Sequence, residues 1–183
     1  MSKWKPGASI KMMHHRSEFI NKVRAFFQKR DLLEVETPAL SQFPAIDLHL
    51  ESFATESGNS RRYLMTSPEY HMKRLIASGS GSIFQICKAF RTDEAGERHN
   101  PEFTILEWYR VGWDYQALMK EIDDLLQVLL NTEPAEYLPF CEAFEQYLGI
   151  NPLDMTLKKF TQACDRNSLT PPDFLLNEDT HRD

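Results

Sequence analysis

Residues 90–109 read FRTDEAGERHNPEFTILEWY, and this stretch decides the fold of the chain. It joins the end of one run rich in aliphatic and aromatic residues, 83–91, to a second such run, 102–111, through the polar segment 92–101. Two runs of this kind around a polar connection are typical of paired antiparallel strands. We therefore predict a β-hairpin with a long loop.

Side chains alternate along a strand, so one face of the second strand carries Phe103, Ile105, Glu107, Tyr109 and Val111. A carboxylate on such a face is costly to bury unless it meets a cation. Composition alone would favour a solvated Glu107, but Arg91 closes the first strand and His99 closes the loop, which brings two anion-binding side chains to one end of the hairpin. We expect the face to hold a flat ring near Phe103 and an ammonium group near Glu107.

The rest of the chain predicts an α+β fold with helices flanking the hairpin. Apolar spacing indicates an amphipathic helix of about four turns from residue 16, and Pro38 should stop a strand over 33–37. Ser67 should cap a helix that has Pro68 and Glu69 in its first turn and ends near residue 78. Further elements are expected at 63–66 (strand), from Asp114 onward (helix), and at 140–148 and 156–166 (helices). We predict an N-terminal lead over 1–15, one domain over 16–166 and a loose tail over 167–183.

The composition of the chain indicates which classes of protein and which kinds of site are expected. The chain of 183 residues lacks a run of ~20 apolar residues and a leader-like N-terminus, which predicts a cytoplasmic protein without a membrane partner. Cys87, Cys141 and Cys164 show neither disulfide nor metal-ligand spacing, so no metal site is predicted. Residues 1–110 hold 16 Lys and Arg against 13 Asp and Glu, whereas 111–183 hold 5 against 14, so anion chemistry should lie in the first part.

Three blocks resemble class II lysyl-tRNA synthetases. Residues 90–109 are similar to motif 2 of that family, residues 34–38 (EVETP) to the end of motif 1, and residues 66–75 (TSPEYHMKRL) to a block near the substrate. The resemblance is close over about 14–130 and implies a class II synthetase-type antiparallel sheet flanked by helices. Motif 3, a glycine-rich segment ending in an arginine, has no candidate after Gly112, so the predicted domain contains motifs 1 and 2 and is incomplete at the C-terminus.

The resemblance implies ATP with Mg²⁺ and a set of site residues. Arg91 would hold the α-phosphate and the substrate carboxylate as the catalytic residue, and Phe103 would stack on adenine. Glu69, with Ser67 beside it, would bind the substrate α-amino group, and Glu107 with Tyr109 would bind its side-chain ammonium. The remaining implied positions are His99, Asn100 and either Asp93 or Glu94 at ATP, and Pro38 at a homodimer interface.

The start of the motif 1 helix near residue 16 leaves no room before it for an anticodon-binding domain, and the net charge is −6. Both features argue against tRNA as a partner. They favour the synthetase-like paralogues that attach (R)-β-lysine, or lysine, to a lysine of elongation factor P. A fragment of a lysyl-tRNA synthetase is the alternative enzyme. An inactive truncated product, or a dimerisation or regulatory module, is the alternative of another class.

Overall fold

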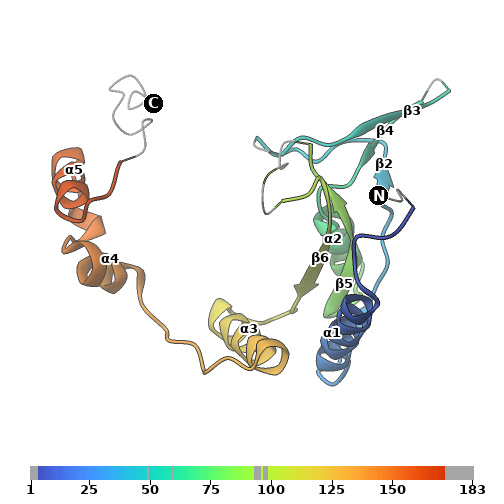
Figure 1. Ribbon diagram of the computed structural model, residues 1–183, viewed down its shortest axis with the longest axis horizontal. Coiled ribbons are helices and arrows are strands. Elements are labelled where there is room, and N and C mark those ends of the chain that lie inside the picture. Colours follow the sequence, from blue (N-terminus) through green and yellow to red (C-terminus); the bar gives the residue numbers. More distant parts are fainter. Residues whose placement is uncertain (1–3, 49, 59, 93–95, 97–98, 172–183) are drawn as a thin grey trace. The chain divides into compact units, whose positions relative to one another are not determined.

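The computed structural model describes residues 4–48, 50–58, 60–92, 96 and 99–171. The chain forms two compact units, Met1–Pro134 and Ala135–Asp183. The boundary between the two units follows Pro134 and lies within the segment 16–166, whose assignment as one domain stays a prediction. The hairpin and every residue of the candidate site belong to the first unit (Figure 1).

The predicted hairpin is confirmed. Strand β5 (Ile83–Phe90) pairs with β6 (Glu102–Tyr109) in an antiparallel register that runs from Ile83 opposite Tyr109 to Phe90 opposite Glu102. The short strand β1 (Leu33–Glu34) lies parallel to β5, giving the strand order β1-β5-β6. The sheet is thus mixed rather than purely antiparallel, because the long connection between β1 and β5 permits a parallel crossover.

The core lies on one face of the hairpin. Helix α1 (Ile10–Gln28) brings Val23, Phe26 and Phe27 against it, and the ring of Phe27 stacks on that of Phe84 with centroids 4.9 Å apart. From β6, Leu106 and Trp108 pack against the same cluster. Alternate residues of each strand therefore face the core, and those between them face the other side of the sheet.

Helix α1 begins at Ile10, so the predicted start near residue 16 was wrong. The Ser9 side chain accepts a hydrogen bond from the backbone N–H of Met12, 3.2 Å away, and caps the helix before the predicted start. A serine at this position is a helix-start signal that the apolar periodicity alone did not reveal. The predicted lead over 1–15 is correspondingly shorter.

A second sheet has the order β2-β4-β3 and lies beyond the end of the hairpin that is farther from α1 (Figure 1). It consists of β2 (Leu40–Ser41), β3 (Ala54–Ser57) and β4 (Ser60–Leu64). The strand predicted at 63–66 starts earlier, and β2 and β3 were not predicted. Helix α2 (Glu69–Ala77) follows, as expected, and the Phe90 N–H donates to the Met65 carbonyl, which ties this region to the hairpin.

Helix α3 (Tyr115–Leu130) is capped by Asp114, as predicted, and is joined to β6 by a buried ion pair. Arg110 and Glu121 are 8% and 3% exposed, and the Arg110 Nε donates to both Glu121 oxygens at 3.0 and 2.9 Å. The Trp108 indole N–H donates to the same carboxylate at 3.1 Å, and Arg110 donates to the Arg30 carbonyl at the end of α1 at 3.0 Å. One charge network thus connects α1, β6 and α3.

The second unit contains the two helices predicted there. They are α4 (Phe140–Leu148) and α5 (Leu157–Arg166), with a short 3₁₀ turn, η1 (Pro152–Asp154), between them. Thr156, predicted as the first residue of the helix, is its N-cap and accepts a hydrogen bond from the Lys159 N–H. All three cysteines are free thiols. No helix in the described ranges has the length and apolar character needed to cross a membrane.

We predict that Glu121→Gln destabilises the first unit by about 3–5 kcal/mol, because it leaves the Arg110 guanidinium buried without a counter-charge. Glu102→Gln on the same hairpin is the matched control. Its ion pair with Lys88 is 53–55% exposed, so its loss should change stability by less than about 1 kcal/mol. Urea unfolding of both variants measures the difference, and equal midpoints would contradict a role for the network in holding α3.

Candidate functional site

The face of the hairpin opposite the core carries a carboxylate bound to a phenol. The Tyr109 hydroxyl donates to Glu107 Oε1 over 2.7 Å, and both side chains are half-buried. Gln85, which is 2% exposed, lies directly across from Glu107 in the register and accepts a hydrogen bond from the Thr37 hydroxyl at 3.0 Å. The predicted shared face of Glu107 and Tyr109 is therefore present, with a buried amide beside it.

A second carboxylate comes from the first turn of α2. The Glu69 backbone N–H donates to Ser67 Oγ at 3.2 Å, but the N-cap is Pro68, one residue after the predicted cap Ser67. The Glu69 carboxylate accepts a hydrogen bond from the Lys73 ammonium one turn later. Ser67 and Glu69 also line a small hollow of about 40 Å³ with Asp47, a third acidic residue.

The charges of the two carboxylates influence each other. Burial raises the pKa of Glu107 above its ordinary value of 4.5; the Tyr109 hydrogen bond opposes this rise, the Glu69 charge adds to it and the Lys73 charge opposes it. The pKa of Tyr109 is also raised, first by burial and then by its bond to Glu107. Glu69 raises the pKa of Lys73 through their hydrogen bond. An incoming cation would therefore be stabilised on this face.

Arg91 stands at the end of the hairpin with its guanidinium 5.0 Å from the centre of the Phe103 ring. Its Nε donates to the carbonyl of the buried Thr66 at 3.3 Å, and its backbone N–H donates to the Pro101 carbonyl at 2.9 Å. The start of α2 and the end of β5 are thereby joined through one arginine. A cation beside an aromatic plane suits a nucleotide, whose phosphate and base need these two partners.

The other predicted nucleotide-binding residues belong to the loop of the hairpin. His99 is exposed and its backbone exchanges hydrogen bonds with Gly96 at 3.1 and 3.3 Å, which closes a turn in the loop. Asn100 is exposed too, and the side chains of His99 and Asn100 form no hydrogen bond or ion pair with another described residue. Asp93 and Glu94 lie outside the described residues. The roles of these four residues stay predictions.

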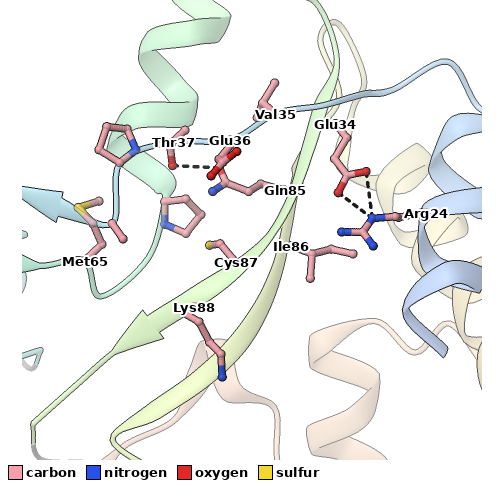
Figure 2. A pocket seen from close by; sticks show the side chains of 13 residues that line it. Arg24, Glu34, Val35, Glu36, Thr37, Met65, Gln85, Ile86, Cys87 and Lys88 are labelled. Atoms are coloured by element: carbon pink, nitrogen blue, oxygen red, sulfur yellow. Dashed lines mark hydrogen bonds and ion pairs between the residues drawn. The ribbon is translucent and has the colours of Figure 1, made fainter. Parts of the chain in front are cut away.

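A cavity of about 610 Å³ opens along the edge of β5, where β1 ends after two residues (Figure 2). Figure 2 shows Gln85 and Cys87 on the side of Thr37, and Ile86 on the side of the Arg24–Glu34 ion pair, as strand alternation requires. Pro38 is exposed on its rim. Glu107 and Tyr109 do not line this cavity.

Two residues of the candidate site, Lys73 and Gln85, were not predicted from the sequence. Lys73 belongs to the quoted block 66–75 but was given no role, although its spacing of four residues from Glu69 is a known signal for a helical ion pair. Gln85 could have been found from the register, because a residue placed opposite Glu107 must share its face. Its burial depends on the segment around Thr37, which no local pattern indicates.

The profile of the family described as "tRNA synthetases class II (D, K and N)" matches residues 4–163. The chain belongs to this family. The class II synthetase assignment agrees with the resemblance of the three sequence blocks and with the mixed sheet and helices of the first unit. Members of the family use ATP.

Three curated relatives that match most of this chain share one name. The chain is 55% identical over 156 residues to a protein of Mannheimia succiniciproducens named elongation factor P–(R)-β-lysine ligase, covering 82% of this chain and 48% of the relative. It is 49% identical over 187 residues to a protein of that name from Pseudoalteromonas translucida, covering 98% and 56%. A protein of that name from Photobacterium profundum is 48% identical over 162 residues, covering 85% and 50%. This class II synthetase chain spans about half the length of these curated relatives.

We predict that Glu107→Gln makes the ligand-free chain more stable at neutral pH. Because the pKa of Glu107 is raised in the folded state, the folded chain binds more protons than the unfolded chain just above pH 4.5. Stability contributed by this group is therefore lost as pH rises through the folded-state pKa. Glutamine has no such loss and still accepts the Tyr109 hydrogen bond.

Urea unfolding from pH 4 to pH 8 measures the effect. The stability advantage of Glu107→Gln over the wild type should grow as pH rises and then level off. An advantage that is constant across this range, or a variant that is less stable at pH 7, would contradict a desolvated carboxylate at position 107. Glu102→Gln should show no such pH-dependent advantage because Glu102 is exposed.

Proposed function

We propose that these residues form the amino-acid-binding and α-phosphate-binding part of an enzyme that activates (R)-β-lysine, or lysine, with ATP. The activated aminoacyl group then passes to a lysine of elongation factor P. The observation that carries the proposal is the half-buried Glu107 carboxylate, bound to Tyr109 and electrostatically coupled to Glu69. Membership of an amino-acid-activating family and the names of the relatives support it.

The two carboxylates match the two amines of the substrate. Lysine and β-lysine each carry a side-chain ammonium and a second amino group near the carboxylate. Glu107, with the Tyr109 hydroxyl, would bind the first, and Glu69, beside Ser67, would bind the second. A partly desolvated carboxylate rejects uncharged isosteres strongly, because it would be left without a partner in their presence.

Arg91 would act as the catalytic residue at the phosphate. A carboxylate oxygen of the amino acid attacks the α-phosphorus of ATP, the new O–P bond forms, and the bond to pyrophosphate breaks. Negative charge on the transferring phosphoryl group is stabilised by a fixed guanidinium, so Arg91 contributes positioning and electrostatic stabilisation. Phe103, 5.0 Å away, would stack on the adenine ring. The aminoacyl-adenylate then holds the amino acid for transfer.

In the second step the ε-amine of a lysine of the factor attacks the acyl carbon. An amide bond forms, the bond between the acyl carbon and the AMP oxygen breaks, and the amine proton goes to solvent. Magnesium would bind together with the phosphates of the nucleotide, as it usually does in sites that use one or two carboxylates. When bound, it neutralises phosphate charge.

A homodimer bordered by Pro38 remains a proposal from the family resemblance. The exposed position of Pro38 on the rim of the 610 Å³ cavity is compatible with it. Sedimentation velocity on the chain would detect the dimer, and a purely monomeric boundary at micromolar concentration would contradict it.

Amino-acid binding tests the site directly. By isothermal titration, the chain should bind (R)-β-lysine or lysine and reject norleucine, which lacks the side-chain amine. Glu107→Gln should weaken lysine binding by about 30-fold or more, since loss of one partner of a desolvated ion pair costs roughly 2 kcal/mol or more. Glu102→Gln should bind normally. Unchanged binding by Glu107→Gln would remove this carboxylate from the pocket.

Product analysis separates the candidate reactions. The proposed function predicts an ATP-dependent, β-lysyl-sized mass increase on elongation factor P, which Arg91→Ala abolishes. Acylation of lysine tRNA without modification of the factor would favour the lysyl-tRNA synthetase alternative. Normal lysine binding with neither product would favour the alternative of another class, an inactive truncated product or a dimerisation or regulatory module.

A further inference from the structure

Helix α2 holds an internal amine, that of Lys73, against Glu69, a carboxylate of the proposed pocket. The Lys73 ammonium donates a hydrogen bond to Glu69, and its positive charge also opposes the rise in the pKa of Glu107. The substrate presents the same chemical group, an ammonium on a flexible alkyl chain. In the ligand-free chain, an amine of the protein therefore occupies the carboxylate that the proposed function assigns to an amine of the substrate.

Counting charges shows why the internal and external amines compete. The proposed function assigns Glu69 and Glu107 to the two ammonium groups of a bound lysine and Arg91 to its carboxylate. Lys73 is a further ammonium group at Glu69, which lines a hollow that Asp47 also lines. Like charges within a few ångströms repel, which disfavours Lys73 and a substrate amine on the same carboxylate.

We propose that Lys73 is a built-in competitor of the substrate: its ammonium occupies Glu69 in the empty site and is displaced when the substrate amino group near the carboxylate binds there. This inference rests on the proposed function and adds a residue that sets amino-acid affinity. Lys73 lowers affinity for ligands that need Glu69, and it prevents Glu69 from standing as an uncompensated anion between catalytic cycles.

The side chain of Lys73 is suited to leave. It is 56% exposed, its four-carbon stem is flexible, and exposed helical pairs four residues apart are weak. Met72, its neighbour in sequence, is fully buried and anchors the helix, so displacement requires no movement of α2. A pair that only stabilised the helix would have no influence on ligand binding, which separates the two interpretations.

The test compares Lys73→Met with the wild-type chain by isothermal titration of two ligands. Lysine or (R)-β-lysine uses both carboxylates, whereas 6-aminohexanoate lacks the second amine and does not need Glu69. Lys73→Met should bind the diamine about 3- to 10-fold more tightly and 6-aminohexanoate within about twofold of wild type. The gain should shrink at 0.5 M NaCl because the competing charges are partly exposed.

Two further variants separate competition at Glu69 from a general effect of replacing a lysine. Lys120→Met removes an equivalent exposed helical pair with Asp124 and should bind as the wild type does. Lys73→Gln should repeat the result of Lys73→Met with a polar side chain. Unchanged or weaker diamine binding by both Lys73 variants, while the wild type binds and Glu107→Gln does not, would overturn the competitor role and leave the proposed function intact. Absence of lysine binding by the wild type would instead overturn the proposed function.

Discussion

The register of the β5–β6 hairpin is the constraint on which the rest of the structure depends. Pairing Gln85 with Glu107 and Phe84 with Trp108 sends one set of side chains into the core and the other to the site. Because strand side chains alternate with a period of two, a slip by one residue would exchange the faces. It would bury Glu107 among aromatic rings and expose Trp108. The apolar face therefore fixes the position of every polar group on the other side.

The core face of the hairpin supplies stability that offsets the cost of the partly desolvated Glu107 on the site face. Arg110, Glu121 and Trp108 join β6 to α3, and Arg110 reaches the end of α1, so the hairpin is held from one side by a buried network. On the other side, Glu107 is partly desolvated without a permanent cation of its own, which raises its pKa. A site that is unfavourable when empty gains most when a cation binds, and the structure around it must supply the missing stability.

The sequence predicted correctly those features of the structure that follow from a local pattern, such as strand alternation or a helix cap. Strand parity placed Glu107 beside Tyr109, and the cap residue Asp114 marked the start of α3 correctly. It did not predict features that depend on contacts between residues distant in sequence. The parallel pairing of β1, the burial of Gln85 by Thr37 and the bond from Arg91 to the Thr66 carbonyl join residues 25 or more positions apart. No local periodicity specifies such pairs. The Lys73–Glu69 bond is local and could have been predicted from its spacing.

The central claim is that Glu107 binds the side-chain ammonium of lysine. The most direct measurement is the titration of the Glu107 carboxyl carbon by ¹³C NMR, with and without saturating lysine. We expect a pKa of Glu107 above 4.5 in the free chain and a lower pKa in the complex, because the ammonium stabilises the ionised carboxylate. A pKa of Glu107 that stays the same when lysine is bound would contradict the claim.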